Sequence, residues 1–147
     1  MSAILIKFGG EVTESPEQLA NLCDSVKKLH QAGENIVLVH GGGPIANALS
    51  EKMGLTPKMV GGRRVTCEQT LEVMKMVLPG IVNSNVLAML YARGLPAVSA
   101  SGIGVVKTHK RPPKAVSGSN GEKIDFGFVG DVDDIWVVQA GLCTRSF

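Results

Sequence analysis

The stretch that decides the fold is Ile36-Val37-Leu38-Val39-His40-Gly41-Gly42-Gly43-Pro44. Four apolar residues, three of them β-branched, are followed at once by a histidine, three glycines and a proline that can open a helix. An unbroken apolar run without polar alternation is typical of a strand buried in a parallel sheet. The stretch therefore predicts a buried strand, a glycine turn and a helix.

The same arrangement occurs near the amino terminus, where Ala3-Ile4-Leu5-Ile6 leads into Lys7-Phe8-Gly9-Gly10. A junction of strand, glycine turn and helix leaves backbone N–H groups free above the sheet edge, and an anion satisfies them well. Two such junctions indicate one site that handles two anionic groups. Neither turn contains G-x-x-x-x-G-K-[ST] or G-x-G-x-x-G, so the common nucleotide-binding patterns are absent.

The residues around these turns predict helices. Ser15 can cap a helix that Pro16 opens and Gly33 ends, with a buried face of regularly spaced apolar residues: Leu19, Leu22, Cys23, Val26 and Leu29. Pro44 opens the next helix, which Gly54 ends, with three inward residues: Ile45, Leu49 and Met53. This order of strands and helices implies parallel strands joined by right-handed crossovers.

The middle of the chain predicts a hairpin or loop at 57–65, followed by a helix that Thr66 caps. We expect Leu71, Met74 and Leu78 to face inward and Pro79-Gly80 to kink or break this helix. A second helical stretch runs from about 82 to 91, and 96–101 predicts a third buried strand.

The last third contains short alternating stretches and the hairpin signal Ser119-Asn120-Gly121. We interpret the run 107–111 as a solvated strand and loop. Taken together, the patterns predict an α/β fold with a mostly parallel sheet, helices on both of its faces and a β-hairpin region at the end.

Composition excludes several kinds of partner. The chain has 147 residues, a net charge of +2 and only 4% aromatic residues, which argues against nucleic acid. No apolar stretch approaches the length of a membrane span, and no signal peptide is evident. The cysteines, Cys23, Cys67 and Cys143, are scattered without zinc-ligand spacing, so we expect no metal site and a reduced, cytoplasmic protein.

Individual side chains allow two interpretations each. Lys7 ends an apolar strand beside two glycines, which favours a phosphate-directed lysine over one that only reaches solvent. His40 is interpreted as a hydrogen-bonded structural residue rather than a base. Arg63-Arg64 could bind a carboxylate or form a solvated basic turn, and both possibilities stay open.

Three motifs, in this order and spacing, resemble the amino acid kinase family. They are Lys-Phe-Gly-Gly at 7–10, His-Gly-Gly-Gly-Pro at 40–44 and Gly-Arg-Arg-Val-Thr at 62–66. Within the family they are most similar to the N-acetylglutamate kinases, whose pattern the stretches 71–78 and 128–132 also fit. Aspartokinases share the first motif but usually lack the triple-glycine turn. The resemblance covers nearly the whole chain and implies a three-layer α/β/α sandwich.

The resemblance implies transfer of a phosphoryl group from ATP, with Mg²⁺, to the side-chain carboxylate of N-acetyl-L-glutamate in arginine biosynthesis. It assigns transition-state stabilisation to Lys7 and phosphate binding to Gly9 and Gly10. It assigns substrate binding to Gly42, Gly43 and Arg64. It also implies a homodimer or a higher homo-oligomer, with a dimer face on the helices around Pro79.

The chain departs from the family pattern at Ile45-Ala46 and at Pro79. These departures leave open a related substrate, such as an acetylated or carrier-linked aminoadipate. A non-catalytic module that binds an acyl amino acid is a further alternative.

We expect residues 1–140 to be the amino-acid-binding half of such a domain. The ATP-binding half is not recognisable, and its carboxylate is not matched by Asp131, Asp133 or Asp134, so we expect little or no kinase activity from this chain alone. Residues 141–147 fit no expected element. One codon choice for them reads Gly-Tyr-Val-Pro-Val-Val-Ser when shifted by one nucleotide, which suggests a frameshifted tail.

Overall fold

A computed structural model describes residues 3–102, 106–117 and 119–135. The chain divides into two units, Met1–Pro57 with Glu68–Ser99 and Lys58–Cys67 with Ala100–Phe147, and each is described by itself. The expected tail at 141–147 and Cys143 lie outside the described residues.

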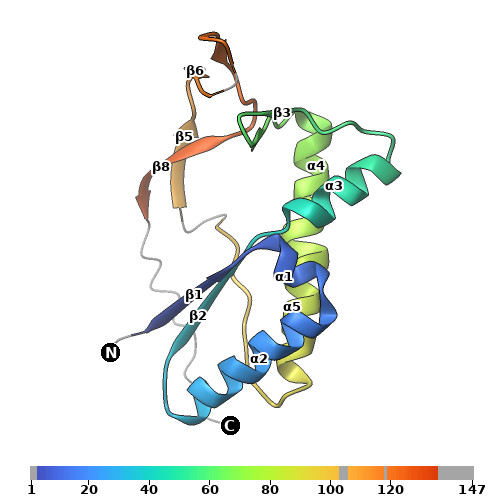
Figure 1. The fold of residues 1–147 in the computed structure, drawn as a ribbon. Helices are drawn as coiled ribbons and strands as arrows, with labels where there is room; N and C mark the ends of the chain where they lie inside the picture. Colours follow the sequence, from blue (N-terminus) through green and yellow to red (C-terminus); the bar gives the residue numbers. More distant parts are fainter. Residues whose placement is uncertain (1–2, 103–105, 118, 136–147) are drawn as a thin grey trace. The chain divides into compact units, whose positions relative to one another are not determined.

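The first unit consists of two strands and a set of helices (Figure 1). In chain order these are β1 (Ile4–Phe8), α1 (Gly10–Glu14), α2 (Pro16–Gln31), β2 (Ile36–His40), α3 (Gly43–Lys52), α4 (Glu68–Met76), the π-helical turn η1 (Val77–Val82) and α5 (Asn83–Tyr91). The predicted alternation of strand and helix is confirmed, although α1 was not expected as a separate helix.

The strands β1 and β2 are parallel and in register from Ile4 opposite Ile36 to Phe8 opposite His40. Both glycine turns therefore leave the same edge of the pair. The Gly41 N–H donates to the Phe8 carbonyl oxygen at 3.1 Å and extends the pairing into the second turn. The parallel pairing predicted from the two apolar runs is confirmed.

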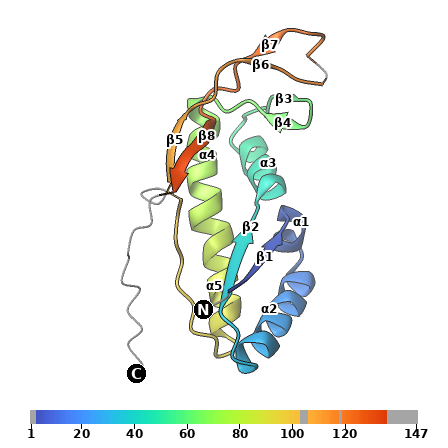
Figure 2. The ribbon, with the colours of Figure 1, turned by 90° about the vertical axis from the view of Figure 1, so that its left-hand side faces the viewer.

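The expected burial of both strand faces is wrong for the described residues. Ile6 and Leu38 pack against the core, whereas Leu5 is 65% exposed and Val37 and Val39 are exposed too. In Figure 1 the helices of this unit lie to one side of the pair, and Figure 2 views the pair from the other side. An apolar run carries no information about which face is covered, because each strand presents alternate residues to opposite faces.

The ends of α2 are as predicted. The Ser15 side-chain oxygen accepts a hydrogen bond from the Gln18 N–H at 3.3 Å, and Pro16 occupies the first turn. Gly33, with φ +86°, follows the last turn in a conformation that favours glycine. In α3 the inward residues include Ala46 and Ser50, whereas Met53 is exposed, contrary to expectation.

We expected Pro79-Gly80 to kink or break the helix. The helix does not break at this point. The chain continues from α4 through η1 into α5, because a π-helical turn tolerates the missing N–H of proline. The face of this long helix that enters the core carries Val73, Val77, Val82, Val86 and Leu90. Leu71, Met74 and Leu78, expected to face inward, are only half-buried.

The fused helix changes one expectation about membranes. Glu68–Tyr91, 24 residues long, has the length and apolar composition that could cross a membrane, although no single apolar run was expected to reach that length. Core helices of soluble proteins meet the same criterion, and this helix supplies much of the core of the first unit.

Residues 96–101 do not form the predicted third strand. Among the described residues this segment pairs with no other strand. It is held by side chains instead: the Tyr91 hydroxyl donates to the Ala97 carbonyl oxygen at 2.7 Å, and Asn83 hydrogen-bonds Ser99. A strand requires a partner ladder, which the residue pattern alone does not supply.

The second unit consists of short antiparallel pairs. β3 (Met59–Val60) pairs with β4 (Arg63–Arg64), β5 (Val106–Lys110) with β8 (Gly130–Ile135), and β6 (Lys114–Ala115) with β7 (Lys123–Ile124). The predicted hairpins at 57–65 and 119–121 are confirmed. Thr66, expected to cap a helix, instead donates its N–H to the Phe126 carbonyl oxygen and accepts from the Phe128 N–H.

Candidate functional site

The two glycine turns lie against each other in the first unit. A methyl group added to Gly10 would lie 2.5 Å from Pro44 Cδ and 3.1 Å from the Gly43 nitrogen. One added to Gly41 would lie 3.2 Å from the Gly10 nitrogen. The absence of side chains at these positions therefore lets the two backbones touch. The structure brings together the two turns that the sequence predicted to share a site.

Gly42 and Gly43 face different surroundings although they are adjacent. A methyl group on Gly42 would lie 2.8 Å from Leu78 Cδ2, whereas one on Gly43 would meet no atom within 4 Å. Gly9 is likewise open, and Gly42 is buried. The space beside Gly9 and Gly43 would let a ligand approach each turn closely.

Lys7 stands opposite Val39 in the parallel pair, one residue before the first glycine turn. It is exposed and lies on the face away from Phe8, which is buried in the core. Within the described parts of the chain no hydrogen bond or ion pair holds its ammonium group. The side chain therefore extends from the exposed face at the edge where both turns begin.

His40 fits the structural interpretation preferred from the sequence. Its Nδ1 lies 3.1 Å from the Gly41 carbonyl oxygen, which can only accept, so Nδ1 carries the hydrogen. Its ring lies 6.1 Å from the ring of Phe8, tilted by 44°. The imidazole thus links the ends of both strands.

Arg64 belongs to the second unit, where it stands opposite Met59 in the β3–β4 hairpin. Gly61 and Gly62, both with positive φ, form the turn of this hairpin. Arg64 is half-buried and Arg63 is exposed, so the two arginines are not equivalent. Partial burial lowers the pKa of the Arg64 guanidinium, because the charged form loses solvation.

The acids of 131–134 have structural partners. Asp131 accepts hydrogen bonds from Arg111 Nε at 2.9 Å and Nη2 at 2.5 Å, and these bonds lower the pKa of its carboxyl group. The Asp133 carboxylate lies 2.5 Å from His109 Nδ1. Side-chain contacts with Arg111 and with His109 of β5 thus account for Asp131 and Asp133.

No cluster of three or more His, Cys, Asp or Glu side chains suited to a metal ion occurs in the described part of the chain. The glycine turns offer backbone groups and Lys7, which suit anions, but no group of carboxylates for Mg²⁺. The described residues therefore offer no ready-made set of side-chain ligands for Mg²⁺.

The chain is similar to known proteins over nearly its whole length. The model of the amino acid kinase family matches residues 2–138. An acetylglutamate kinase from Anaeromyxobacter dehalogenans (strain 2CP-C) is 42% identical over 134 residues, which cover 90% of this chain and 49% of that protein. One from Methanopyrus kandleri is 41% identical over 87% of this chain and 47% of the relative. The chain thus spans about half the length of the curated relatives it matches.

Solved structures agree on the fold. The protein smu.665 from Streptococcus mutans UA159 superposes with a TM-score of 0.69 at 26% identity, over 90% of this chain and 50% of that one. An N-acetylglutamate synthase from Neisseria gonorrhoeae, complexed with coenzyme A and N-acetyl-glutamate, gives 0.68 at 25% identity, over 91% of this chain and 29% of that one. Together with the match over residues 2–138, this similarity shows that the chain belongs to the amino acid kinase family.

Proposed function

We propose that this chain carries the acyl-amino-acid-binding part of an N-acetylglutamate kinase-like protein. The observation that carries the proposal is the contact between the two glycine turns at the carboxyl edge of β1 and β2. In parallel α/β sheets this edge is where ligands bind. The similarity to acetylglutamate kinases points to N-acetyl-L-glutamate as the ligand.

In the proposed reaction a side-chain carboxylate oxygen of N-acetyl-L-glutamate attacks the terminal phosphorus of ATP, and ADP leaves. Gly9 and Gly10 donate N–H bonds to phosphate oxygens, and Lys7 neutralises charge on the transferring group. Gly42 and Gly43 contact the acyl amino acid, and Arg64 binds its α-carboxylate. We assign no step to Mg²⁺, because the described residues offer no ligand set for it.

Binding of N-acetyl-L-glutamate to the purified chain, measured by titration calorimetry, tests the proposal. Arg64→Ala should weaken binding by about tenfold or more through loss of a charge-assisted pair, a loss of roughly 1.4 kcal/mol. Arg63→Ala is the matched control and should leave affinity unchanged, because Arg63 is exposed beside it. Absence of binding to the wild-type chain contradicts the proposal.

The same preparation separates the alternatives. We expect binding without formation of an acyl phosphate when ATP is added, as for a binding module. Detectable acyl phosphate would show that the chain is active alone. A panel that includes acetylated aminoadipate would reveal a related substrate, if that compound bound more tightly than N-acetyl-L-glutamate.

The location and assembly of the protein are also proposals. The scattered, unpaired cysteines support a location in the cytoplasm. Burial raises the pKa of the Cys23 thiol, which keeps this thiol protonated and unreactive. Family membership supports a homodimer. Cell fractionation tests the cytoplasmic location, and light scattering tests the homodimer.

A further inference from the structure

The second glycine turn rests on the long helix at the point where the helix widens. The turn η1 spans six residues, Val77–Val82, with Pro79 inside it. Proline has no N–H and its ring clashes with the preceding turn of an α-helix, so a π-helical turn accommodates it. The widened turn lies between α4 and α5 without interrupting the helix.

Three side chains of η1 surround the buried side of Gly42. A methyl group on Gly42 would lie 2.8 Å from Leu78 Cδ2, 3.1 Å from Val82 Cγ2 and 3.5 Å from Val77 Cγ1. Real side chains essentially never approach as closely as the first of these distances. Gly42 therefore lacks a side chain because η1 occupies that space.

Gly42 also caps the start of α3. Its carbonyl oxygen accepts a hydrogen bond from the Ala46 N–H at 2.9 Å, and Ala46 is fully buried. Pro44 of the same turn packs against Gly10 of the first turn. Any displacement of Gly42 would therefore shift the start of α3 and its contact with the first glycine turn.

We propose that Leu78 and Val82 are positioning residues for the backbone of Gly42 and Gly43. They contact the buried side of Gly42, and the adjacent Gly43 presents its open side to the ligand. For the identity of that ligand the proposal rests on the proposed function, because the probe is N-acetyl-L-glutamate. The contact itself does not depend on any ligand.

The test compares Leu78→Ala with Leu87→Ala, the same change nine residues further along the helix, in α5. Leu87 is half-buried but lies outside the cluster that contacts Gly42. Amide signals of Gly42 and Gly43 in ¹⁵N-labelled chain report the turn, and calorimetry with N-acetyl-L-glutamate reports the site. We expect Leu78→Ala to shift both amide signals and to weaken binding about tenfold, with Leu87→Ala leaving both as in the wild type.

A second pair of variants keeps the proposal testable if Leu78→Ala folds poorly. Leu78→Met conserves volume and should retain the amide positions and the affinity. Gly42→Ala should destabilise the chain, and adding Leu78→Ala should recover part of that loss by making room for the methyl group. Recovery supports the contact.

The outcomes separate the two proposals. A folded Leu78→Ala chain with unchanged Gly42 and Gly43 amide signals overturns the positioning role, whatever the ligand result. If Leu78→Ala shifts the amide signals but leaves the affinity for N-acetyl-L-glutamate unchanged, the position of Gly42 does not matter for ligand binding, and the positioning role is overturned. A wild-type chain that binds no N-acetyl-L-glutamate overturns the proposed function, and the amide signals still decide the contact.

Discussion

Gly127 and Gly121 lie in the same unit, and both have positive φ, +74° and +86°. They differ in their surroundings. A methyl group on Gly127 would collide with the carbonyl group of Thr66, whose strand-like bridge to Gly127 joins two distant parts of the chain. One on Gly121 would meet nothing within 4 Å, because Gly121 only turns a hairpin.

We predict that Gly127→Ala destabilises the chain by about 2–4 kcal/mol, because conformational strain adds to a collision with backbone. Gly121→Ala should lose only about 1 kcal/mol, since strain acts there alone. Urea unfolding followed by circular dichroism measures both. Equal losses would show that the Thr66 contact contributes nothing.

Residue chemistry alone predicted the two glycine turns that meet in the structure, but not how each side chain lies. The glycines of both turns came from the sequence, since few other residues suit such turns after a strand. The exposure of Lys7, and the difference between buried Gly42 and open Gly43, depend on neighbours distant in the sequence. Leu78 was expected in the core, and nothing in its own pattern indicated Gly42 as its neighbour.

At the scale of elements, α2 shows how local signals place a helix. Ser15 caps its start, Pro16 fits its first turn, and Leu19, Cys23 and Val26 are buried as their spacing predicted. Each signal acts within one or two turns of the chain. Such an element can be predicted without knowing its partners.

Ser15→Ala should destabilise the chain by about 1 kcal/mol, because the Gln18 N–H loses its partner. Ser15→Asp should retain the cap. Ser25→Ala in the middle of the same helix is the control, since Ser25 only bonds the preceding turn at Asn21. Thermal unfolding that ranks Ser25→Ala as the more harmful change would contradict this role for Ser15.

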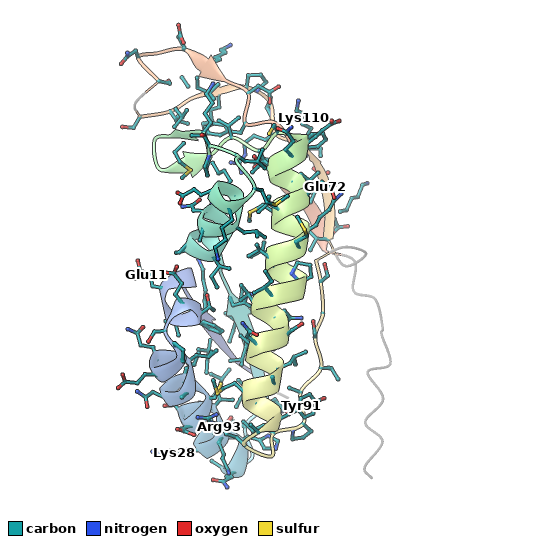
Figure 3. All side chains as sticks on the ribbon, turned by 90° about the vertical axis from the view of Figure 1, so that its right-hand side faces the viewer. Glu11, Lys28, Glu72, Tyr91, Arg93 and Lys110 are labelled. Carbon is teal, nitrogen blue, oxygen red and sulfur yellow. The ribbon has the colours of Figure 1, made fainter. Side chains whose placement is uncertain are left out.

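A second link joins α2 to the end of the long helix. Arg93 Nε donates to Asp24 Oδ1 at 2.6 Å, and Figure 3 shows Arg93 beyond the last turn of α5, near α2. This hydrogen bond lowers the pKa of the Asp24 carboxyl group. Arg93 also donates to the Met89 carbonyl oxygen at 3.2 Å, which orients the guanidinium.

Because the folded-state pKa of Asp24 lies below its ordinary value of about 3.9, the link stabilises the fold above that pH and is lost as pH falls through the folded value. Asp24→Asn should therefore unfold at a lower temperature than the wild type at neutral pH, and this difference in unfolding temperature should shrink below about pH 4. Thermal unfolding between pH 2.5 and pH 7, chosen to bracket roughly that range, measures it. In an Arg93→Gln background the same substitution should have no further effect; an equal effect would contradict the link.

The long helix and the segment after it show where element prediction failed. Pro79 signalled a kink or a break, yet the helix does not break there: it continues through a π-helical turn that keeps Val77 and Val82 in the core. Residues 96–101 signalled a buried strand, yet no ladder partner reaches them among the described residues. In both cases contacts across the fold decided between two local structures that the residues allow.

At the scale of the whole molecule, the exposed face of β1 and β2 is an apolar surface that favours self-association. Leu5 is 65% exposed, and Val37 and Val39 are 48% and 41% exposed. Adjacent apolar residues on a two-stranded sheet favour association with other chains.

Leu5→Thr should reduce concentration-dependent association while changing the unfolding free energy by less than about 0.5 kcal/mol, because the side chain is already in water. Leu19→Ala, which removes a side chain only 3% exposed, should destabilise by about 2–5 kcal/mol. Light scattering over a concentration series, with urea unfolding, checks both. Unchanged association with Leu5→Thr would show that this surface is not involved.

The sequence by itself determined the parallel pair, the two glycine turns, the caps of α2 and the hairpins of the second unit. The parallel pair follows from the order of strand, helix and strand along the chain. The other features depend on interactions between residues close in the chain, or on backbone conformations that few residue types can adopt. Only the tertiary structure decided that β1 and β2 are covered on one face, that Pro79 sits in a π-helical turn and that η1 packs on Gly42. Those features depend on contacts between segments far apart in the sequence, which no local pattern encodes.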